Sequence, residues 1–353
     1  MTYTADGSCT VAGATGAATT VSRTLGRAIL VVDAFNGNVV WQGGGALTTS
    51  STAGARKLNV PNMTCAIPSD VSVLDINRDG FADRLYFGDT CGQMWRVNLF
   101  GTNMNEWSVT RIANISSTSA TNVTNKRKFL FPPDLVLDTD ASGNYTAVLA
   151  GAGDREHAFD TTVTNAFYMF KDRNDSTEVL KGAANATTVK ISGFGTAPTG
   201  SSYTSSSLFD ATSVAVNSSD PLSLNGWRLT LLAGEKVISS ATTVGGSTFF
   251  NTNQPSATAA AGICTSNLGV AREYIVNFST AGATQDLNAL GNLSLANRSS
   301  IRAGGGFLPS PVPVAVEING RKYEAVISGT SVRRPPSTTL DKRVRVYWYK
   351  NVD

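Results

Sequence analysis

The stretch Val71-Ser-Val-Leu-Asp-Ile-Asn-Arg-Asp-Gly-Phe-Ala-Asp-Arg-Leu-Tyr-Phe-Gly88 is the most informative part of this sequence of 353 residues. Its centre, from Asp75 to Asp83, carries acidic or amide side chains at positions 1, 3, 5 and 9 and a glycine, Gly80, at position 6. This spacing is typical of a calcium-binding loop, because alternate side chains converge on one point while the glycine permits a sharp turn.

The residues on either side of this loop predict strands rather than helices. They are rich in β-branched and aromatic residues, and Tyr86 stands at position 12, where a helix-flanked calcium hand has a bidentate Glu. The sequence therefore predicts a calcium loop at the tip of a β-hairpin. Magnesium is disfavoured because it requires a tighter octahedron and retains several waters. The expected Ca²⁺ ligands are the side chains of Asp75, Asn77, Asp79 and Asp83 and the main-chain carbonyl of Phe81.

Electrostatics favour a cation in this loop over an empty turn. Like charges about 4 Å apart repel by roughly 1 kcal/mol in water and about 4 kcal/mol at an effective dielectric constant of 20. Three carboxylates crowded into one loop are therefore expected to spread apart without a cation. The alternative is a polar turn without metal, since Asp, Asn and Gly also favour turns.

Composition excludes some classes of function. The net charge is +3 and charged residues make up 16% of the chain, so nucleic acid is not an expected partner. The short basic clusters at 126–128 and 333–334 are interpreted as solvated loop charges. There is no apolar run of 18 residues and hence no expected transmembrane segment. The polar beginning of the chain suggests a piece of a longer protein.

The four cysteines do not form a CxxC pair, so a zinc site is not expected. Cys65 and Cys91 lie almost symmetrically about Asp79, so the hairpin brings them towards each other. We hypothesise a disulfide at the base of the hairpin, which implies an oxidising compartment. Two buried free thiols are the alternative, and a bridge between Cys9 and Cys264 has weaker support.

Short β-rich runs recur between Gly, Asn, Asp, Ser and Thr clusters, without long helical periodicity. Paired runs every 40–50 residues or so predict an all-β fold, an irregular β-propeller with seven blades; a β-sandwich pair is the alternative. The polar segments 103–127 and 181–222 are expected to be surface insertions. The expected strands are 28–33, 39–41, 85–89, 92–97, 134–138, 145–150, 166–170, 227–232, 248–250, 273–278, 312–317, 322–328 and 343–349.

These motifs together resemble the C-terminal propeller of PilY-type (PilC/PilY) pilus adhesins, from about residue 25 to the end of the chain. The motifs that carry the resemblance are Pro68-Ser-Asp70, the run from Asp75 to Asp89, Gly92-Gln-Met-Trp-Arg96, Gly151-Ala-Gly-Asp-Arg-Glu-His157, Asn165-Ala-Phe-Tyr-Met-Phe-Lys-Asp172, Gly226-Trp227, Gly234-Glu-Lys-Val-Ile238, Cys264-Thr-Ser-Asn-Leu-Gly269 and Phe307-Leu-Pro-Ser-Pro-Val-Pro313.

The resemblance implies that residues 1–353 are a single C-terminal propeller domain of a longer, exported bacterial protein at the cell surface and the pilus tip. Such proteins work with pilins and the pilus machinery in type IV pilus biogenesis. They regulate extension and retraction, and they support twitching motility and adhesion to host or abiotic surfaces. In this family the loop is thought to switch with Ca²⁺, and its ligands carry over onto the five residues named above. This chain has no Arg-Gly-Asp motif, so integrin binding does not carry over.

Two other functions were weighed against this one. A quinone-dependent propeller enzyme is disfavoured because the chain has no adjacent cysteines and a single histidine, His157, which we expect in a buried structural corner; the chain is expected not to be an enzyme. The alternative is a purely structural or glycan-binding propeller in which calcium only stabilises the fold. The run Asp138-Thr-Asp-Ala-Ser-Gly-Asn144 is interpreted as a polar turn rather than a second cation site.

Overall fold

A computed structural model confirms that the chain belongs to the all-β class. It describes the strand segments at 2–3, 8–12 and 18–22 and residues 26–45, 47–52, 56–99, 103–116, 126–173, 204–256, 268–318 and 321–335. Every strand expected within these ranges is present. The expected strand at 343–349 and Cys264 lie outside the described residues. No helix among the described residues is long and apolar enough to cross a membrane.

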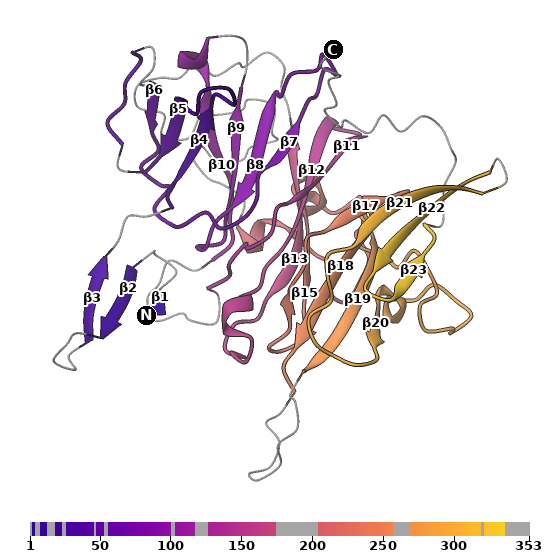
Figure 1. Cartoon of the computed structure of the whole chain (residues 1–353). Coiled ribbons are helices and arrows are strands. Elements are labelled where there is room, and N and C mark those ends of the chain that lie inside the picture. Colours follow the sequence, from indigo (N-terminus) through magenta and orange to yellow (C-terminus); the bar gives the residue numbers. More distant parts are fainter. Residues whose placement is uncertain are drawn as a thin grey trace.

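The strands among the described residues form six sheets that follow one another in chain order (Figure 1). The first sheet consists of β1 (Thr2–Tyr3), β2 (Ser8–Ala12) and β3 (Ala18–Ser22). The second consists of β4 (Ala28–Val32), β5 (Val39–Gly44) and β6 (Arg56–Asn59). The third sheet has the order β10-β9-β8-β7 and consists of β7 (Ser72–Leu74), β8 (Arg84–Gly88), β9 (Gln93–Asn98) and β10 (Ser108–Asn114).

The fourth sheet, β11-β12-β13-β15-β14, contains β11 (Asp134–Asp140), β12 (Gly143–Gly151), β13 (Ala166–Arg173), β14 (Phe209–Asp210) and β15 (Gly226–Thr230). The fifth sheet contains β16 (Lys236–Val237), β17 (Thr242–Val244), β18 (Ser247–Gln254), β19 (Val270–Asn277) and β20 (Ser299–Arg302). The sixth sheet contains β21 (Val312–Ile318), β22 (Arg321–Ser328) and β23 (Ser331–Arg333). Short 3₁₀ turns are η1 (Met104–Glu106), η3 (Arg155–His157), η4 (Ser205–Ser207), η5 (Pro221–Leu224) and η6 (Leu295–Arg298).

Consecutive sheets from β4 onwards pack face to face through four apolar clusters. Successive side chains of a strand point to opposite faces, so Phe87 of β8 packs towards β5 and β6 while its neighbour Tyr86 packs towards β12 and β13. Phe167 and Tyr168 of β13 divide in the same way between the clusters on its two sides. The sheets of β8 and β13 therefore lie inside a stack, and every residue of these two strands is buried.

Aromatic rings join the fourth and fifth sheets. Phe167 stacks on Phe250 with ring centroids 4.0 Å apart, and Phe250 stacks on Tyr274 at 4.8 Å. Offset-stacked pairs of this kind add to the free energy gained from buried apolar area. More than two sheets are stacked in this way, so a single pair of sandwiched sheets does not describe the fold.

The structure refines two expectations. The described residues do not form a closed propeller ring, and seven blades are not seen. The segment 103–127 was expected to be a surface insertion, but its part Ser108–Asn114 is β10, in which Val109 and Ile112 are buried in the core. The segment looks polar because β10 carries Ser, Thr, Arg and Asn between its apolar residues. Of the segment 181–222, residues 181–203 lie outside the described part, and the remainder contains η4, β14 and part of η5.

Candidate metal centre

The predicted calcium loop is the connection of a β-hairpin, as the sequence indicated. Strands β7 and β8 pair in antiparallel register up to Leu74 and Arg84, so the loop consists of residues 75–83 (Figure 1). The amide of Asp83 donates to the carbonyl of Leu74 at 2.9 Å and closes the loop. The carbonyl of Asp83 accepts from the amide of Leu99, which ties the loop to the end of β9.

Asp75 organises the first half of the loop from within. Its side chain is buried, and its two carboxylate oxygens accept the amides of Arg78 at 2.6 Å and Gly80 at 2.9 Å. Both amides can reach the carboxylate because Arg78 (φ 61°) and Gly80 (φ 92°) adopt positive φ. Glycine takes this conformation without steric cost, as predicted for position 6, whereas Arg78 is a strained non-glycine residue.

The other side chains predicted as ligands also turn into the loop. Oδ2 of Asp83 accepts the amides of Ile76 at 2.7 Å and Asn77 at 3.3 Å. Oδ1 of Asn77 accepts the amide of Asp79, and Oδ1 of Asp79 accepts the amide of Phe81 at 2.8 Å. The ring of Phe81 is 74% exposed. The sequence spacing therefore has the local consequence expected of it, because the four polar side chains all face the backbone of the same loop.

The donor set suits a hard cation. It consists of carboxylate, amide and carbonyl oxygens, which are the ligands that Ca²⁺ takes in proteins. An ionised carboxylate has about four lone-pair sites. The two hydrogen bonds that Asp83 accepts from backbone amides both go to Oδ2, which leaves its Oδ1 for a cation. In this structure the carboxylates of Asp75, Asp79 and Asp83 do not all lie within 4.8 Å of one another, so a cation held by all three has to draw them closer.

Tyr86, at position 12, cannot replace the missing Glu ligand. Its side chain is fully buried, and its hydroxyl donates to Oδ2 of Asp172 on β13 at 2.8 Å. Burial, together with the negative charge of Asp172, raises the pKa of Tyr86 to about 12, so the hydroxyl is a neutral donor. The loop therefore offers the five predicted ligand residues and nothing from position 12.

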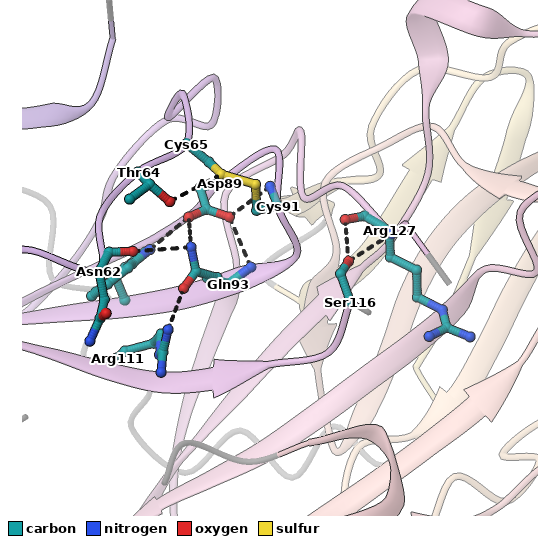
Figure 2. The surroundings of a disulfide bond; sticks show 10 residues. Asn62, Thr64, Cys65, Asp89, Cys91, Gln93, Arg111, Ser116 and Arg127 are labelled. Atoms are coloured by element: carbon teal, nitrogen blue, oxygen red, sulfur yellow. Dashed lines mark hydrogen bonds between the residues drawn. A yellow bond between two sulfur atoms is a disulfide. The ribbon is translucent and has the colours of Figure 1, made fainter. Parts of the chain in front are cut away.

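The predicted disulfide is confirmed. Cys65 and Cys91 are bonded, with their Cα atoms 5.8 Å apart, and Figure 2 shows the bond beside the carboxylate of Asp89. Cys91 lies in the β8–β9 turn and Cys65 lies before β7, so the bond joins the hairpin at the end opposite the loop. A loop at one end and a covalent bond at the other both restrain the hairpin.

Asp89 is a buried carboxylate whose environment the sequence did not reveal. It is fully buried, and its carboxylate accepts the amides of Cys91 and Gln93 and Nε2 of Gln93, all at 2.9 Å (Figure 2). It also accepts Nε1 of Trp95 at 3.0 Å. Burial raises the pKa of Asp89 to about 6, and the four donors only partly offset this effect. Oε1 of Gln93 in turn accepts Nη1 of Arg111 at 2.8 Å.

We predict that stability decreases as pH rises from about 4.5 to 6.5. The folded pKa of Asp89, about 6, exceeds its ordinary value of 3.8, so in this window the folded state binds more protons than the unfolded state, and stability falls until pH passes the folded pKa. Burial raises the pKa of Asp134 to about 6 as well, with the same sign. The expected loss is on the order of 1 to 3 kcal/mol.

Urea unfolding at fixed calcium and a series of pH values measures this effect. Asp140 and Asp160, whose pKa values are lowered, lose their stabilising contributions only below about pH 4, so they do not mask it. Asp89→Asn removes one titrating group and should flatten the slope in this window, whatever its effect on absolute stability. A wild-type slope equal to that of Asp89→Asn would contradict the prediction.

A second polar group, Asp154–Glu156–His157, has ligand atoms within 4.8 Å of one another. Its Asp154 carboxylate already accepts Nζ of Lys128 at 2.6 Å and lies 2.9 Å from Nδ1 of His157. Lys128 thus supplies the positive charge that a metal ion would bring. His157 is hydrogen-bonded, as expected, but its side chain is 47% exposed rather than buried. This group carries no indication of bound metal.

The run from Asp138 to Asn144 contains the end of β11, a two-residue turn at 141–142 and the start of β12, so the polar turn interpreted from the sequence is shorter than the run. Asp140 pairs with Lys171 at 2.7 Å and with Arg173, and this pairing holds the pKa of Asp140 below its ordinary value. Asp138 accepts the hydroxyl of Tyr145 at 2.8 Å. Both acids are therefore engaged by neighbouring strands, which leaves no need for a second cation.

The sequence matches no model of a known protein family, and no curated protein is significantly similar to it.

Proposed function

We propose that this chain is a calcium-binding domain of an exported type IV pilus biogenesis factor and tip adhesin, in which Ca²⁺ in the loop from Asp75 to Asp83 regulates pilus extension and retraction. The observation that carries the proposal is the loop itself, whose four acidic or amide side chains all face one short stretch of backbone. The disulfide between Cys65 and Cys91 supports an oxidising, extracytoplasmic location. The assignment to the type IV pilus rests on the resemblance of the surrounding motifs to PilY-type adhesins.

The position of the loop supports a regulatory role for the cation. Asp83 is followed by Arg84, which is 1% exposed and lies 3.9 Å from Asp172 in the next sheet. Cation binding neutralises repulsion within the loop, and contraction of the loop acts on a residue that contacts the neighbouring sheet. A ligand that binds one arrangement of this contact better than another shifts the population towards it.

We further propose that the stacked sheets are blades of an irregular β-propeller with seven blades. Support comes from the order of packing, because each sheet from β4 to β23 follows its predecessor in the chain and packs on it through a shared core. Radial repetition of sheets protects their edges from pairing with other chains. Small-angle X-ray scattering of the purified domain tests this, since a closed ring gives a more compact profile than an open stack.

Asp79→Asn is predicted to weaken calcium binding by about 10- to 100-fold (1.4 to 2.7 kcal/mol) and to leave the fold intact. The substitution removes one charge, while the amide oxygen can still accept the amide of Phe81. Isothermal titration with CaCl₂ measures the affinity, and thermal melts with Ca²⁺ or a chelator measure the linked stabilisation, about 2.7 kcal/mol at 100 times the dissociation constant.

Asp70→Asn is the matched control, because Asp70 is exposed and lies outside the loop but loses the same charge. Unchanged calcium affinity in Asp79→Asn, or an equal loss in Asp70→Asn, would exclude the loop as the site. A raised melting temperature without any effect of Asp79→Asn on pilus retraction would favour the alternative, a structural or glycan-binding propeller that calcium only stabilises. Retraction is scored as twitching motility in cells that depend on this protein.

A further inference from the structure

A concave site lies where η1 and Trp107 approach β5 and β6. It is a pocket of about 300 Å³ lined by residues of β5 and β6, of the chain just before β6, and of η1 and its C-terminal residue. This volume is at the lower end of the range of small-molecule sites. The residues of the calcium loop do not line the pocket, so its occupant does not depend on the proposed function.

Two tryptophans form the apolar wall of the pocket. The ring centroids of Trp41 and Trp107 lie 5.7 Å apart with their planes tilted by 59°. Trp41 is 2% exposed and belongs to the core, whereas Trp107 is half-buried. Met104 and Trp107 both pack against the core cluster that contains Trp41, and Trp107 also lines the pocket.

The pocket is positively charged. Arg56 and Lys57 line it, and no lining residue is acidic. Nε of Arg56 is buried without a hydrogen-bond partner, and its Nη1 contacts Sδ of Met104 at 3.8 Å, a weak acceptor. Arg96 and Arg298 also have an unpartnered Nε, but their Nη1 atoms donate to oxygens at 2.6–2.7 Å. Arg56 is therefore a guanidinium that still lacks the anionic oxygen it binds best.

The remaining lining residues are short polar side chains, among them Thr49, Ser50 and Asn105. Oγ1 of Thr49 accepts the amide of Asn59 at 3.2 Å, and Oγ of Ser50 accepts the amide of Thr52 at 3.3 Å. Because each hydroxyl already accepts a hydrogen bond from the backbone, its own hydrogen is free to donate to a ligand. The pocket thus combines an aromatic face, an unsatisfied guanidinium and several hydroxyl and amide groups.

We propose that this pocket binds a sugar ring that carries an anionic substituent, a carboxylate or a sulfate. The apolar face of the ring packs on Trp107, the ring hydroxyls bond to the Thr, Ser and Asn side chains, and Arg56 forms a charge-assisted pair with the anionic group. A nucleotide also combines an anion with a flat ring. The lining favours the sugar, because the second tryptophan is tilted instead of parallel and does not form a slot for a planar base.

Isothermal titration of the whole chain tests the proposal with four probes: glucuronic acid, glucose 6-sulfate, glucose and adenosine monophosphate. We expect one or both of the anionic sugars to bind at least about tenfold more tightly than glucose, since a hydrogen bond to a charged group is stronger than one between neutral groups. The comparison of carboxylate with sulfate identifies the source of the charge. Affinities should be the same with Ca²⁺ and with a chelator.

Arg56→Gln is expected to abolish the preference for the anionic sugar, with a loss of about tenfold or more, and to leave binding of glucose unchanged. Arg155→Gln, which removes an exposed guanidinium elsewhere, is the control and should bind like wild type. The melting temperature of Arg56→Gln shows whether this variant is folded. If it is not, Lys57→Gln, which also removes a positive charge from the pocket, tests the same loss of preference for the anionic sugar. Equal affinities of Arg56→Gln and wild type, tighter binding of adenosine monophosphate than of either sugar, or no binding of any probe would overturn the proposal.

Discussion

Asp172→Asn is expected to lower the free energy of unfolding by about 3 to 5 kcal/mol, the range found when one partner of a buried ion pair is removed. Asp172 on β13 is 1% exposed and accepts Nη1 of Arg96 on β9 at 2.6 Å, and Arg84 lies 3.9 Å away. The carboxylate is the anion of this cluster, so its loss leaves two guanidinium groups buried between the sheets with reduced compensation.

Denaturant unfolding of the purified domain measures this loss, and Asp210→Asn provides the comparison. Asp210 pairs with Arg228 at 2.6 Å, but its side chain is 49% exposed. Exposed pairs contribute about 0 to 1 kcal/mol because water screens them. If both variants lose the same amount, or if Asp172→Asn loses less than about 1 kcal/mol, the buried cluster does not hold the two sheets together as described.

Replacement of both Cys65 and Cys91 by Ala is expected to cost about 3 to 4 kcal/mol, the loop-closure value for a bond of this span. The two residues are separated by 26 positions and join the segment before β7 to the β8–β9 turn. Without the bond the unfolded chain gains conformational freedom, whereas the hydrogen bonds of the loop from Asp75 to Asp83 remain. Calcium affinity should therefore change much less than stability.

A reductant provides the internal control for this prediction. Dithiothreitol should lower the melting temperature of the wild-type domain and leave that of the double alanine variant unchanged. Alanine is preferred to serine because Cys65 is 2% exposed, and a buried hydroxyl would add its own cost. Equal stability of the wild type and the double variant would show that the bond between Cys65 and Cys91 does not constrain the chain.

The candidate site was predictable from sequence because its geometry is local. Every hydrogen bond that turns Asp75, Asn77, Asp79 and Asp83 inward connects residues no more than seven positions apart. Acidic and amide residues make such short-range bonds in turns, and Gly80 supplies the positive φ that the turn needs. Pairing of Cys65 with Cys91 was likewise a consequence of the antiparallel register about the loop.

Other parts of the molecule gave no usable signal in sequence. Asp172 and Arg96 are 76 residues apart, and nothing near either one indicates that they pair. Gly88 was expected only as part of the strand 85–89, but a Cβ atom there would lie 2.3 Å from Cβ of Phe129. The pocket at Arg56 depends on Trp107, which approaches Trp41 from the segment between β9 and β10. The polar appearance of β10 concealed a core strand for the same reason, because its burial depends on the sheet it joins.

The amino-acid sequence was sufficient to predict the hairpin, its nine-residue loop with Gly80 at the sharp turn, the all-β class and the disulfide at the hairpin base. These features rest on strand alternation and on contacts between residues close together in the chain. The packing of the sheets was needed to see that Tyr86 faces Asp172 instead of the loop, and that consecutive sheets share apolar cores. The physical reason is that burial in a stack depends on which faces meet, and a strand buried on both faces no longer shows in its own sequence which neighbour lies on each side.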